Sequence, residues 1–210
     1  MTLDRLRPMA ERVLDPFVTA ADRVGLTPNG ISVLAFGFAV AAGAVYTLAG
    51  GAVGGVNPDP ILYLVGAVLV FLNGWMDLMD GALARRQGTD SRAGDLLDHV
   101  LDRYADIVIV AGLAGGAGQY LLGLLAVTGV LMTSYLGTQA QAVGLDRVYG
   151  GVVGRADRLA VIGATTAVAA VLSAPLLYGL TLVGWLLVFL AVVGHLTALQ
   201  RFYHSLAAIE

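Results

Sequence analysis

The chain has 210 residues, of which 58% are hydrophobic and 13% are charged, and its formal net charge is −3. Because soluble domains carry about 25% charged residues, this composition excludes an ordinary soluble enzyme and predicts an integral membrane protein. The sequence has no cysteine and no lysine, which excludes disulfides, thiolate metal ligands and Schiff-base chemistry on lysine.

Residues 1–25 form the first predicted element. Charged residues recur every few positions in this segment, and the apolar residues between them repeat with a spacing of about 3.6 residues. The pattern predicts an amphipathic helix that lies in the membrane interface. A soluble amphipathic cap on a helix bundle fits the same pattern equally well.

Six long apolar windows follow, and each is near the roughly 20 residues that an α-helix needs to cross a bilayer. They are residues 29–50, 60–84, 95–116, 118–143, 157–175 and 178–203. Thr27 suits the cap of the first helix and Pro28 its first turn. The sequence therefore predicts a single all-α integral membrane domain over residues 1–210, with six transmembrane helices plus an N-terminal amphipathic interfacial helix.

The arginines predict the orientation of these spans. They precede the first span, lie between the second and third and between the fourth and fifth, and occur near the end of the sixth, whereas the other three connections contain none. Arginine-rich connections remain on the cytoplasmic side of a membrane. We therefore expect a multi-pass protein of the cell membrane, with both termini and the arginine-bearing loops in the cytoplasm.

An acidic pattern, D-x2-D-G-x2-A-R-x8-G-x3-D-x3-D, covers the end of the second span and the start of the third. Its fixed positions are Asp77, Asp80, Gly81, Ala84, Arg85, Gly94, Asp98 and Asp102. Residues three or four apart share one face of a helix. The pattern thus predicts two acidic helix faces at the cytoplasmic surface, on helices that pack antiparallel.

Acidic side chains in such a place require compensation, because each costs roughly 2.5–3.5 kcal/mol at the centre of a membrane span. Oxygen ligands without nitrogen or sulfur suit Mg²⁺, Mn²⁺ or Ca²⁺ rather than zinc. Two such ions would remove the repulsion between the acids and bind a diphosphate. The alternative is a network of aspartate and arginine that only holds the helix ends together.

This segment resembles the signature of the CDP-alcohol phosphotransferases at every fixed position, and the predicted spans are similar to that family too. The resemblance implies an Mg²⁺-dependent enzyme of phospholipid biosynthesis, which transfers a lipid-phosphate group from a CDP-lipid to an alcohol and releases CMP. It further implies two Mg²⁺ ions, with Mn²⁺ as a possible substitute, and a general base at Asp102. The implied metal ligands are Asp77, Asp80, Asp98 and Asp102.

The same resemblance implies a site for the CDP-lipid donor. Its residues are Pro28, Asn29, Gly81, Ala84, Arg85, Ser91 and Gly94. The expected partners are this donor, a small polar alcohol, membrane lipid and a second copy of the chain, with no nucleic acid. Runs of small residues at 41–44 and 111–116 favour close helix packing, which a homodimer interface would also use.

A phosphorylated acceptor would need arginine ligands. Arg155, Arg158 and Arg201 resemble positions that bind the acceptor phosphate in relatives that make inositol-phosphate lipids, although cytoplasmic anchoring explains arginines there as well. Those relatives often carry a basic residue after a Ser-Tyr pair in the fourth span, and none follows Ser134-Tyr135 here. This difference counts against inositol phosphate. The expected acceptor is a phosphorylated polyol such as glycerol phosphate or inositol phosphate, and an unphosphorylated alcohol also remains open.

Two other functions also use acids in membranes. An intramembrane prenyltransferase binds a prenyl diphosphate through paired acidic motifs, and a cation carrier binds ions through acids at mid-membrane. The contiguous pattern, with Gly81 and Arg85 inside it, favours the phosphotransferase. Beyond the pattern, Asp106 is expected to pair with Arg103 or Arg155.

Overall fold

The computed structural model describes residues 7–53, 55, 57–89, 91–145 and 153–209, without the side chains of residues 7–12. The rest of the predicted N-terminal element and Arg147 lie outside the described residues. Within them the chain is helical throughout and contains no strand. The elements are α1 (Arg7–Arg23), α2 (Pro28–Ala49), α3 (Ile61–Gln87), α4 (Arg92–Gly116), α5 (Tyr120–Ala142), α6 (Arg155–Ala169), the short 3-10 helix η2 (Leu177–Gly179) and α7 (Leu182–Ile209).

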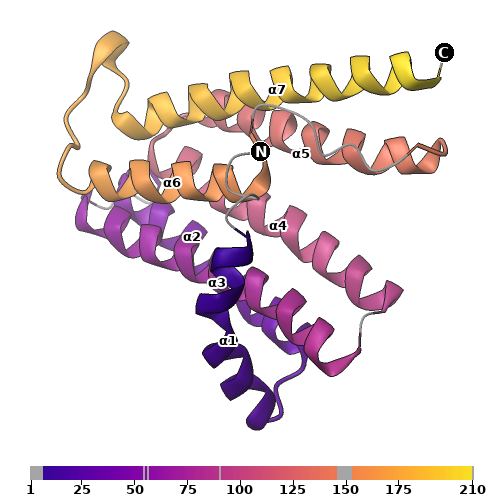
Figure 1. Cartoon of the computed structure of the whole chain (residues 1–210). Coiled ribbons are helices and arrows are strands. Elements are labelled where there is room, and N and C mark those ends of the chain that lie inside the picture. Colours follow the sequence, from indigo (N-terminus) through magenta and orange to yellow (C-terminus); the bar gives the residue numbers. More distant parts are fainter. Residues whose placement is uncertain (1–6, 54, 56, 90, 146–152, 210) are drawn as a thin grey trace.

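The helices form two packed groups that α4 and α6 connect (Figure 1). In the first group α2 packs against α3 and α4, and in the second α5 packs against α7. Helix α4 also contacts α5, while α6 contacts both α3 and α7. The region between α3, α4 and α6 therefore lies where α6 meets the first group.

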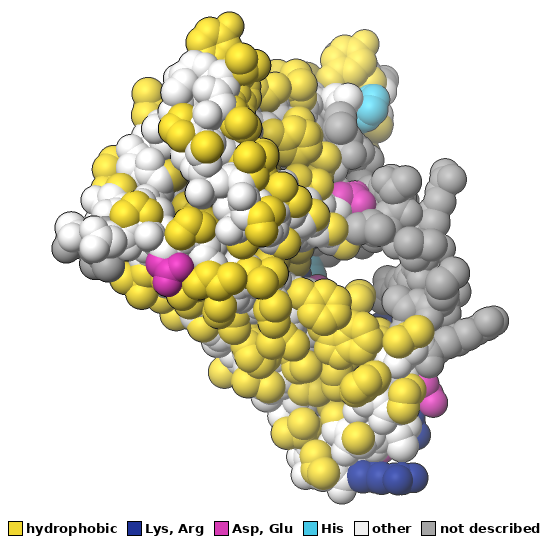
Figure 2. Space-filling model, turned by 90° about the vertical axis from the view of Figure 1, so that its left-hand side faces the viewer, with side chains coloured by type: hydrophobic (Ala, Val, Ile, Leu, Met, Phe, Trp, Pro, Cys, Tyr) yellow, Lys and Arg dark blue, Asp and Glu magenta, His cyan; other side chains and the backbone are white. Residues whose placement is uncertain are grey.

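Four helices, α2, α3, α5 and α7, are long and apolar enough to cross a membrane. The surface agrees with this, because one face of the molecule is covered mainly by hydrophobic side chains and presents few charged ones (Figure 2). The fold is thus that of an all-helical, multi-pass membrane protein.

Helix α6 differs from its predicted span. It has 15 residues and ends at Ala169, whereas the apolar window continues to 175. At a rise of about 1.5 Å per residue it is roughly 22 Å long, which is shorter than a hydrocarbon core of about 30 Å. Pro175 explains part of the difference, because proline lacks a backbone donor and disfavours helical geometry in the residue before it.

Helix α1 is amphipathic, as its pattern predicts. On one side Leu14, Val18 and Ala21 are buried in a cluster with residues of α2 and α3. Val13 and Phe17 on the other side remain about half exposed, at 54% and 50%. Helix α1 therefore packs against the bundle and also offers an apolar surface outward.

Glycines allow the backbones of α2 and α4 to touch. A Cβ atom at Gly43 would lie only 2.6 Å from the carbonyl oxygen of Val108 on α4, and one at Gly112 would collide with the backbone of Gly43. The small-residue runs of the sequence are thus used within one chain. They consequently provide no support for a dimer interface at these positions.

Helices α3 and α4 do not pack against each other, contrary to the sequence prediction. Among the described residues, no Cα atom of α3 lies within 8 Å of a Cα atom of α4. Helix α2 contacts both of them, so they are held together through α2 rather than by direct packing. The gap leaves room for side chains and a ligand between the two acidic faces.

The contact at Gly43 gives a test of the fold. We expect Gly43→Ala to destabilise the protein by about 1–3 kcal/mol, the usual range for overpacking. Gly37→Ala is the matched control on the same helix, because a Cβ atom there meets nothing within 4 Å. Thermal unfolding in detergent measures both, and equal midpoints for the two variants would contradict the described helix contact.

Candidate metal and nucleotide site

Three acids of the pattern meet in the gap between α3 and α4. Asp77 reaches in from α3, and Asp98 and Asp102 reach in from successive turns of α4. Each offers a carboxylate oxygen, and these oxygens lie within 4.8 Å of one another. A cluster of carboxylate oxygens is a donor set that hard divalent cations prefer. The residues present therefore fit a divalent metal ion.

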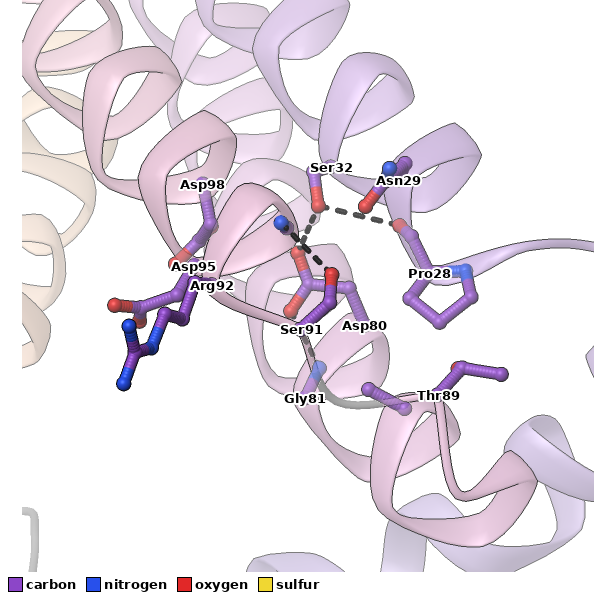
Figure 3. Close-up of a pocket in the computed structure, with 12 residues that line it drawn as sticks. Pro28, Asn29, Ser32, Asp80, Gly81, Thr89, Ser91, Arg92, Asp95 and Asp98 are labelled. Atoms are coloured by element: carbon purple, nitrogen blue, oxygen red, sulfur yellow. Dashed lines mark hydrogen bonds between the residues drawn. The ribbon is translucent and has the colours of Figure 1, made fainter.

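The fourth acid, Asp80, is oriented differently. Its Oδ2 accepts a hydrogen bond of 2.6 Å from the Ser32 hydroxyl on α2, and its Oδ1 accepts one of 2.5 Å from the backbone N–H of Gly81. The side chain is buried, and it points toward Ser32 at the start of α2 (Figure 3). Asp80 is outside the three-acid cluster and lines the neighbouring cavity.

A cavity of about 460 Å³ opens beside the acids, at the ends of α2, α3 and α4 (Figure 3). All the predicted donor-site residues except Arg85 line it, together with Asp80 and Asp98. Arg85 lies close by, since its Nη1 atom would be 3.4 Å from a Cβ atom placed at Gly81. The further lining residues are Ser32, Thr89, Arg92 and Asp95.

Two helix N-termini open toward this cavity. The Thr27 hydroxyl accepts from the Gly30 N–H at 3.2 Å and caps α2, while the Ser91 hydroxyl accepts from the Gly94 N–H at 3.1 Å and caps α4. Helix N-termini carry partial positive charge and unpaired N–H groups that suit phosphate. The cavity therefore combines polar caps on one side with carboxylates on the other.

Gly94 permits this arrangement. A Cβ atom there would lie 3.2 Å from the Ser91 hydroxyl oxygen and 3.3 Å from the Asn29 side-chain oxygen. Any larger residue would consequently fill the space between the starts of α2 and α4. The glycine of the sequence pattern thus keeps the cavity open.

Arg155, the first residue of α6, lies against the acid cluster. Its Nη1 is 2.7 Å from Asp77 Oδ1 on α3, and its Nη2 is 2.8 Å from Asp102 Oδ1 on α4. The guanidinium therefore bridges the two acidic helices. The prediction that placed Arg155 near an acceptor did not include this ion pair.

Asp106 organises the other arginines. Its Oδ2 lies 2.5 Å from Arg158 Nη2 and 3.5 Å from Arg103 Nη1, and all three side chains are largely shielded from solvent. The sequence suggested a pair with Arg103 or Arg155. Both pairs are present, since Arg155 Nε lies 3.9 Å from Asp106 Oδ1. The shortest ion pair, with Arg158, was not predicted.

Two arginines reach the same part of α5. Arg201 on α7 is buried and donates to the Thr133 carbonyl oxygen at 2.6 Å, and Arg103 on α4 donates to the Ser134 hydroxyl. Arginines of α4 and α7 thus reach neighbouring residues of α5, and Arg103 and Arg155 also pair with Asp102 of the acid cluster. The sequence analysis did not indicate Ser32 or the contact of Arg103 with Ser134, because in each pair the two residues lie far apart along the chain.

Comparisons with known proteins agree with this geometry. The family model for CDP-alcohol phosphatidyltransferase matches residues 25–199. The chain is 34% identical over 204 residues to an archaetidylinositol phosphate synthase of Methanothermobacter thermautotrophicus, covering 95% of this chain and 91% of that protein. It is also 34% identical over 197 residues to a phosphatidylinositol phosphate synthase of Mycolicibacterium smegmatis, covering 89% and 80% of the two.

Solved structures of a relative resemble the fold. The phosphatidylinositol phosphate synthase PgsA1 of Mycobacterium tuberculosis with CDP-DAG bound is 25% identical, with a TM-score of 0.74 over 92% of this chain and 94% of that one. The structure of the same synthase in complex with manganese and citrate is also 25% identical. It gives a TM-score of 0.73 over 90% of this chain and 87% of that one. That relative thus binds a CDP-lipid and a divalent metal on a similar fold.

The hydrogen bond between Ser32 and Asp80 gives a second test. We expect Ser32→Ala to weaken Mn²⁺ binding by about 10–100-fold, as loss of an outer-shell partner typically does, because Asp80 would lose the donor that orients it. Thr128→Ala is the control, since that exposed hydroxyl bonds only to carbonyl groups of its own helix. Electron paramagnetic resonance of free Mn²⁺ measures both affinities, and equal values would show that Ser32 does not support the site.

Proposed function

Because the chain belongs to the CDP-alcohol phosphatidyltransferase family, we propose that it transfers a lipid-phosphate group from a CDP-lipid to a polar alcohol and releases CMP. The observation that carries this proposal is the contact between the acid cluster and the polar cavity, with Asp98 belonging to both. A prenyltransferase or a cation carrier would not need a nucleotide-sized cavity at this place. The relatives named above also favour the phosphotransferase over both alternatives.

The cavity is the proposed site of the cytidine diphosphate. The capped N-termini of α2 and α4 and the nearby Arg85 offer donors to the diphosphate, while Gly81 and Gly94 leave space for the nucleotide. The donor is CDP-diacylglycerol or CDP-archaeol, since relatives with names of both lipid types resemble the chain. The lipid tails extend from the cavity into the bilayer.

Two Mg²⁺ ions are the proposed cofactors, with Mn²⁺ as a substitute. Asp77, Asp98 and Asp102 would hold one ion, and Asp80 would contribute to the second from the cavity side. Bound there, the ions would neutralise the charge that develops on the diphosphate during transfer. The manganese complex of the related synthase supports a divalent metal in this family.

Asp102 is the proposed general base. It projects from α4 into the cluster, and its side chain is 16% exposed, so a carboxylate oxygen remains within reach of an incoming hydroxyl group. The carboxylate accepts the proton of the acceptor hydroxyl group while the hydroxyl oxygen attacks the lipid-bearing phosphorus. A new phosphorus–oxygen bond forms, the bond to the CMP phosphate breaks, and CMP leaves with the bridging oxygen.

A polyol phosphate is the proposed acceptor, and inositol phosphate is the first candidate. Arg158 and Arg201 are buried, so anchoring at the membrane surface does not explain them. Arg103 reaches Ser134 from α4, which supplies a cation where the fourth span itself has none. Together with Arg155, these arginines form the proposed site for the acceptor phosphate.

We propose six membrane spans. The fifth consists of α6 together with the apolar segment that follows it to residue 175, because α6 alone is too short to cross. Helix α4 is the other span beside the four most apolar helices, and α1 lies in the interface. Both termini and the acid cluster face the cytoplasm, and the protein forms a homodimer. Because the small-residue runs pack within one chain, that dimer would use other lipid-facing surfaces.

Purified protein should release CMP from a CDP-lipid in the presence of Mg²⁺ and a suitable acceptor. We expect Asp102→Asn to lower kcat by at least about 100-fold, since a general base typically contributes 10²–10⁴-fold. Asp59→Asn, which alters an exposed acid at the opposite end of the bundle, should leave the rate unchanged. Chromatographic measurement of CMP provides the readout.

A panel of acceptors completes this experiment. Inositol phosphate, glycerol phosphate, inositol and serine are each tested with both donor lipids, and inositol phosphate is expected to give the highest kcat/KM. If no acceptor supports CMP release and Asp102→Asn behaves like the parent protein, the proposed reaction is wrong. If only unphosphorylated alcohols react, the proposed role of the arginines is wrong.

Single cysteines test the orientation, because the natural sequence has none. Thr89 and Ser173 are both exposed and lie in connections at opposite ends of the bundle. With a membrane-impermeant maleimide, we expect Ser173→Cys to react in intact cells and Thr89→Cys to react only after permeabilisation. The reverse pattern would invert the proposed topology.

A further inference from the structure

Arg155 uses the same carboxylates that a divalent cation would use. Its two terminal nitrogens approach Asp77 Oδ1 at 2.7 Å and Asp102 Oδ1 at 2.8 Å. Those two acids, with Asp98, make up the cluster whose oxygens lie within 4.8 Å of one another. The guanidinium and a metal ion therefore cannot both hold these oxygens in the same way.

Charge makes the conflict stronger. The side chains of Arg155 and Asp102 are 15% and 16% exposed, so water screens their charges only partly. A divalent cation among the three acids would stand next to the guanidinium, and two like charges in such surroundings repel strongly. Binding of either cation at these carboxylates is therefore unfavourable for the other in its present position.

The position of Arg155 allows it to move without a change in the bundle. It is the first residue of α6, and the N-terminus of that helix is held separately by the Asp157 carboxylate, which accepts from the Gly154 N–H at 3.1 Å. The long arginine side chain can thus change its rotamers while α6 remains fixed. Arg158 lies one turn further along α6, on the same face as Arg155. Arg103 of α4 approaches the same Asp106 oxygen as Arg158.

We propose that Arg155 and a divalent cation compete for Asp77 and Asp102, and that cation binding transfers the Arg155 guanidinium to the phosphate of the acceptor. This inference rests on the proposed function. Metal ion and anionic acceptor then bind with positive coupling, since each favours the same position of Arg155. Arg155 is thus a positioning residue: it favours binding of the acceptor when the metal ion is bound.

A purely structural role for Arg155 predicts the opposite result. If the guanidinium only held α3 and α4 at the right distance, its removal would loosen the acid cluster and weaken metal binding. Competition instead predicts that removal strengthens metal binding. The sign of the change in metal affinity therefore separates the two roles.

The first experiment measures Mn²⁺ affinity of the full-length protein in detergent by electron paramagnetic resonance. We expect Arg155→Gln to bind Mn²⁺ about fivefold or more tightly than the parent, the lower end of typical coupling between sites. Arg155→Lys keeps the charge but cannot bridge two carboxylates with a planar fork, so it should also bind more tightly. Circular dichroism shows that each variant is folded.

Arg86→Gln is the matched control for loss of one positive charge. Arg86 pairs with Asp15 and Asp22 of α1 at 3.3 Å and 3.8 Å and does not contact the acid cluster. Its removal should change Mn²⁺ affinity by less than about twofold, since charges near the surface are screened. An equal increase in Arg86→Gln and Arg155→Gln would overturn the competition.

The second experiment adds inorganic phosphate as the probe for the acceptor anion. At the same concentrations, phosphate should increase the Mn²⁺ affinity more in the parent than in Arg155→Gln. Pairing of Mn²⁺ with phosphate in solution affects both proteins equally, so it cancels when the two are compared. An equal effect in both proteins would overturn the transfer of Arg155 to phosphate.

The outcomes separate this inference from the proposed function. Unchanged or weaker Mn²⁺ binding in both Arg155 variants, with CMP release by the parent intact, overturns the competition alone. Failure of the parent and of all variants to bind Mn²⁺ overturns both the competition and the proposed metal site.

Discussion

Contact between α2 and its two neighbours sets the distance between the acidic helices. Glycine-mediated approach draws α4 against one side of α2, and α3 packs against another. The backbones of α3 and α4 consequently stay apart, and only their longer side chains meet. The acid cluster, the polar cavity and the Arg155 bridge all depend on this separation, since direct packing of α3 on α4 would fill the same space.

Compensation of charge accounts for much of the remaining architecture. Asp80 has a hydroxyl and an N–H donor, Asp106 has two close arginines, and Asp77 and Asp102 share a third. Buried charges persist only where partners or ions offset the lost hydration. The partners come from α2, α4 and α6, so the same contacts that neutralise the acids also hold α6 against α3 and α4.

Local spacing was enough to predict the acidic faces, because residues three or four apart share a face wherever the helix lies. The predicted residues of the cavity came instead from the family resemblance, and Ser32, Thr89, Arg92 and Asp95 complete its lining. The distance between the faces was not predictable, since it depends on contacts of both helices with α2. Ser32 and the pair of Arg158 with Asp106 depend on contacts between distant parts of the chain, for which a single sequence has no periodic signal. The end of α6 at Ala169 was not predicted for a different reason, because the apolar composition continues past the helix toward Pro175.

The cavity lies at the ends of helices whose outer faces are apolar, and this has a consequence for kinetics. In an enzyme of the proposed activity, the lipid substrate arrives by lateral diffusion in two dimensions, whereas the water-soluble substrate arrives from the bulk phase. Saturation by the first is then governed by its mole fraction among the bilayer lipids, and saturation by the second by its molar concentration. Dilution of the vesicles with inert lipid and dilution of the buffer consequently act on two separate steps of the same catalytic cycle.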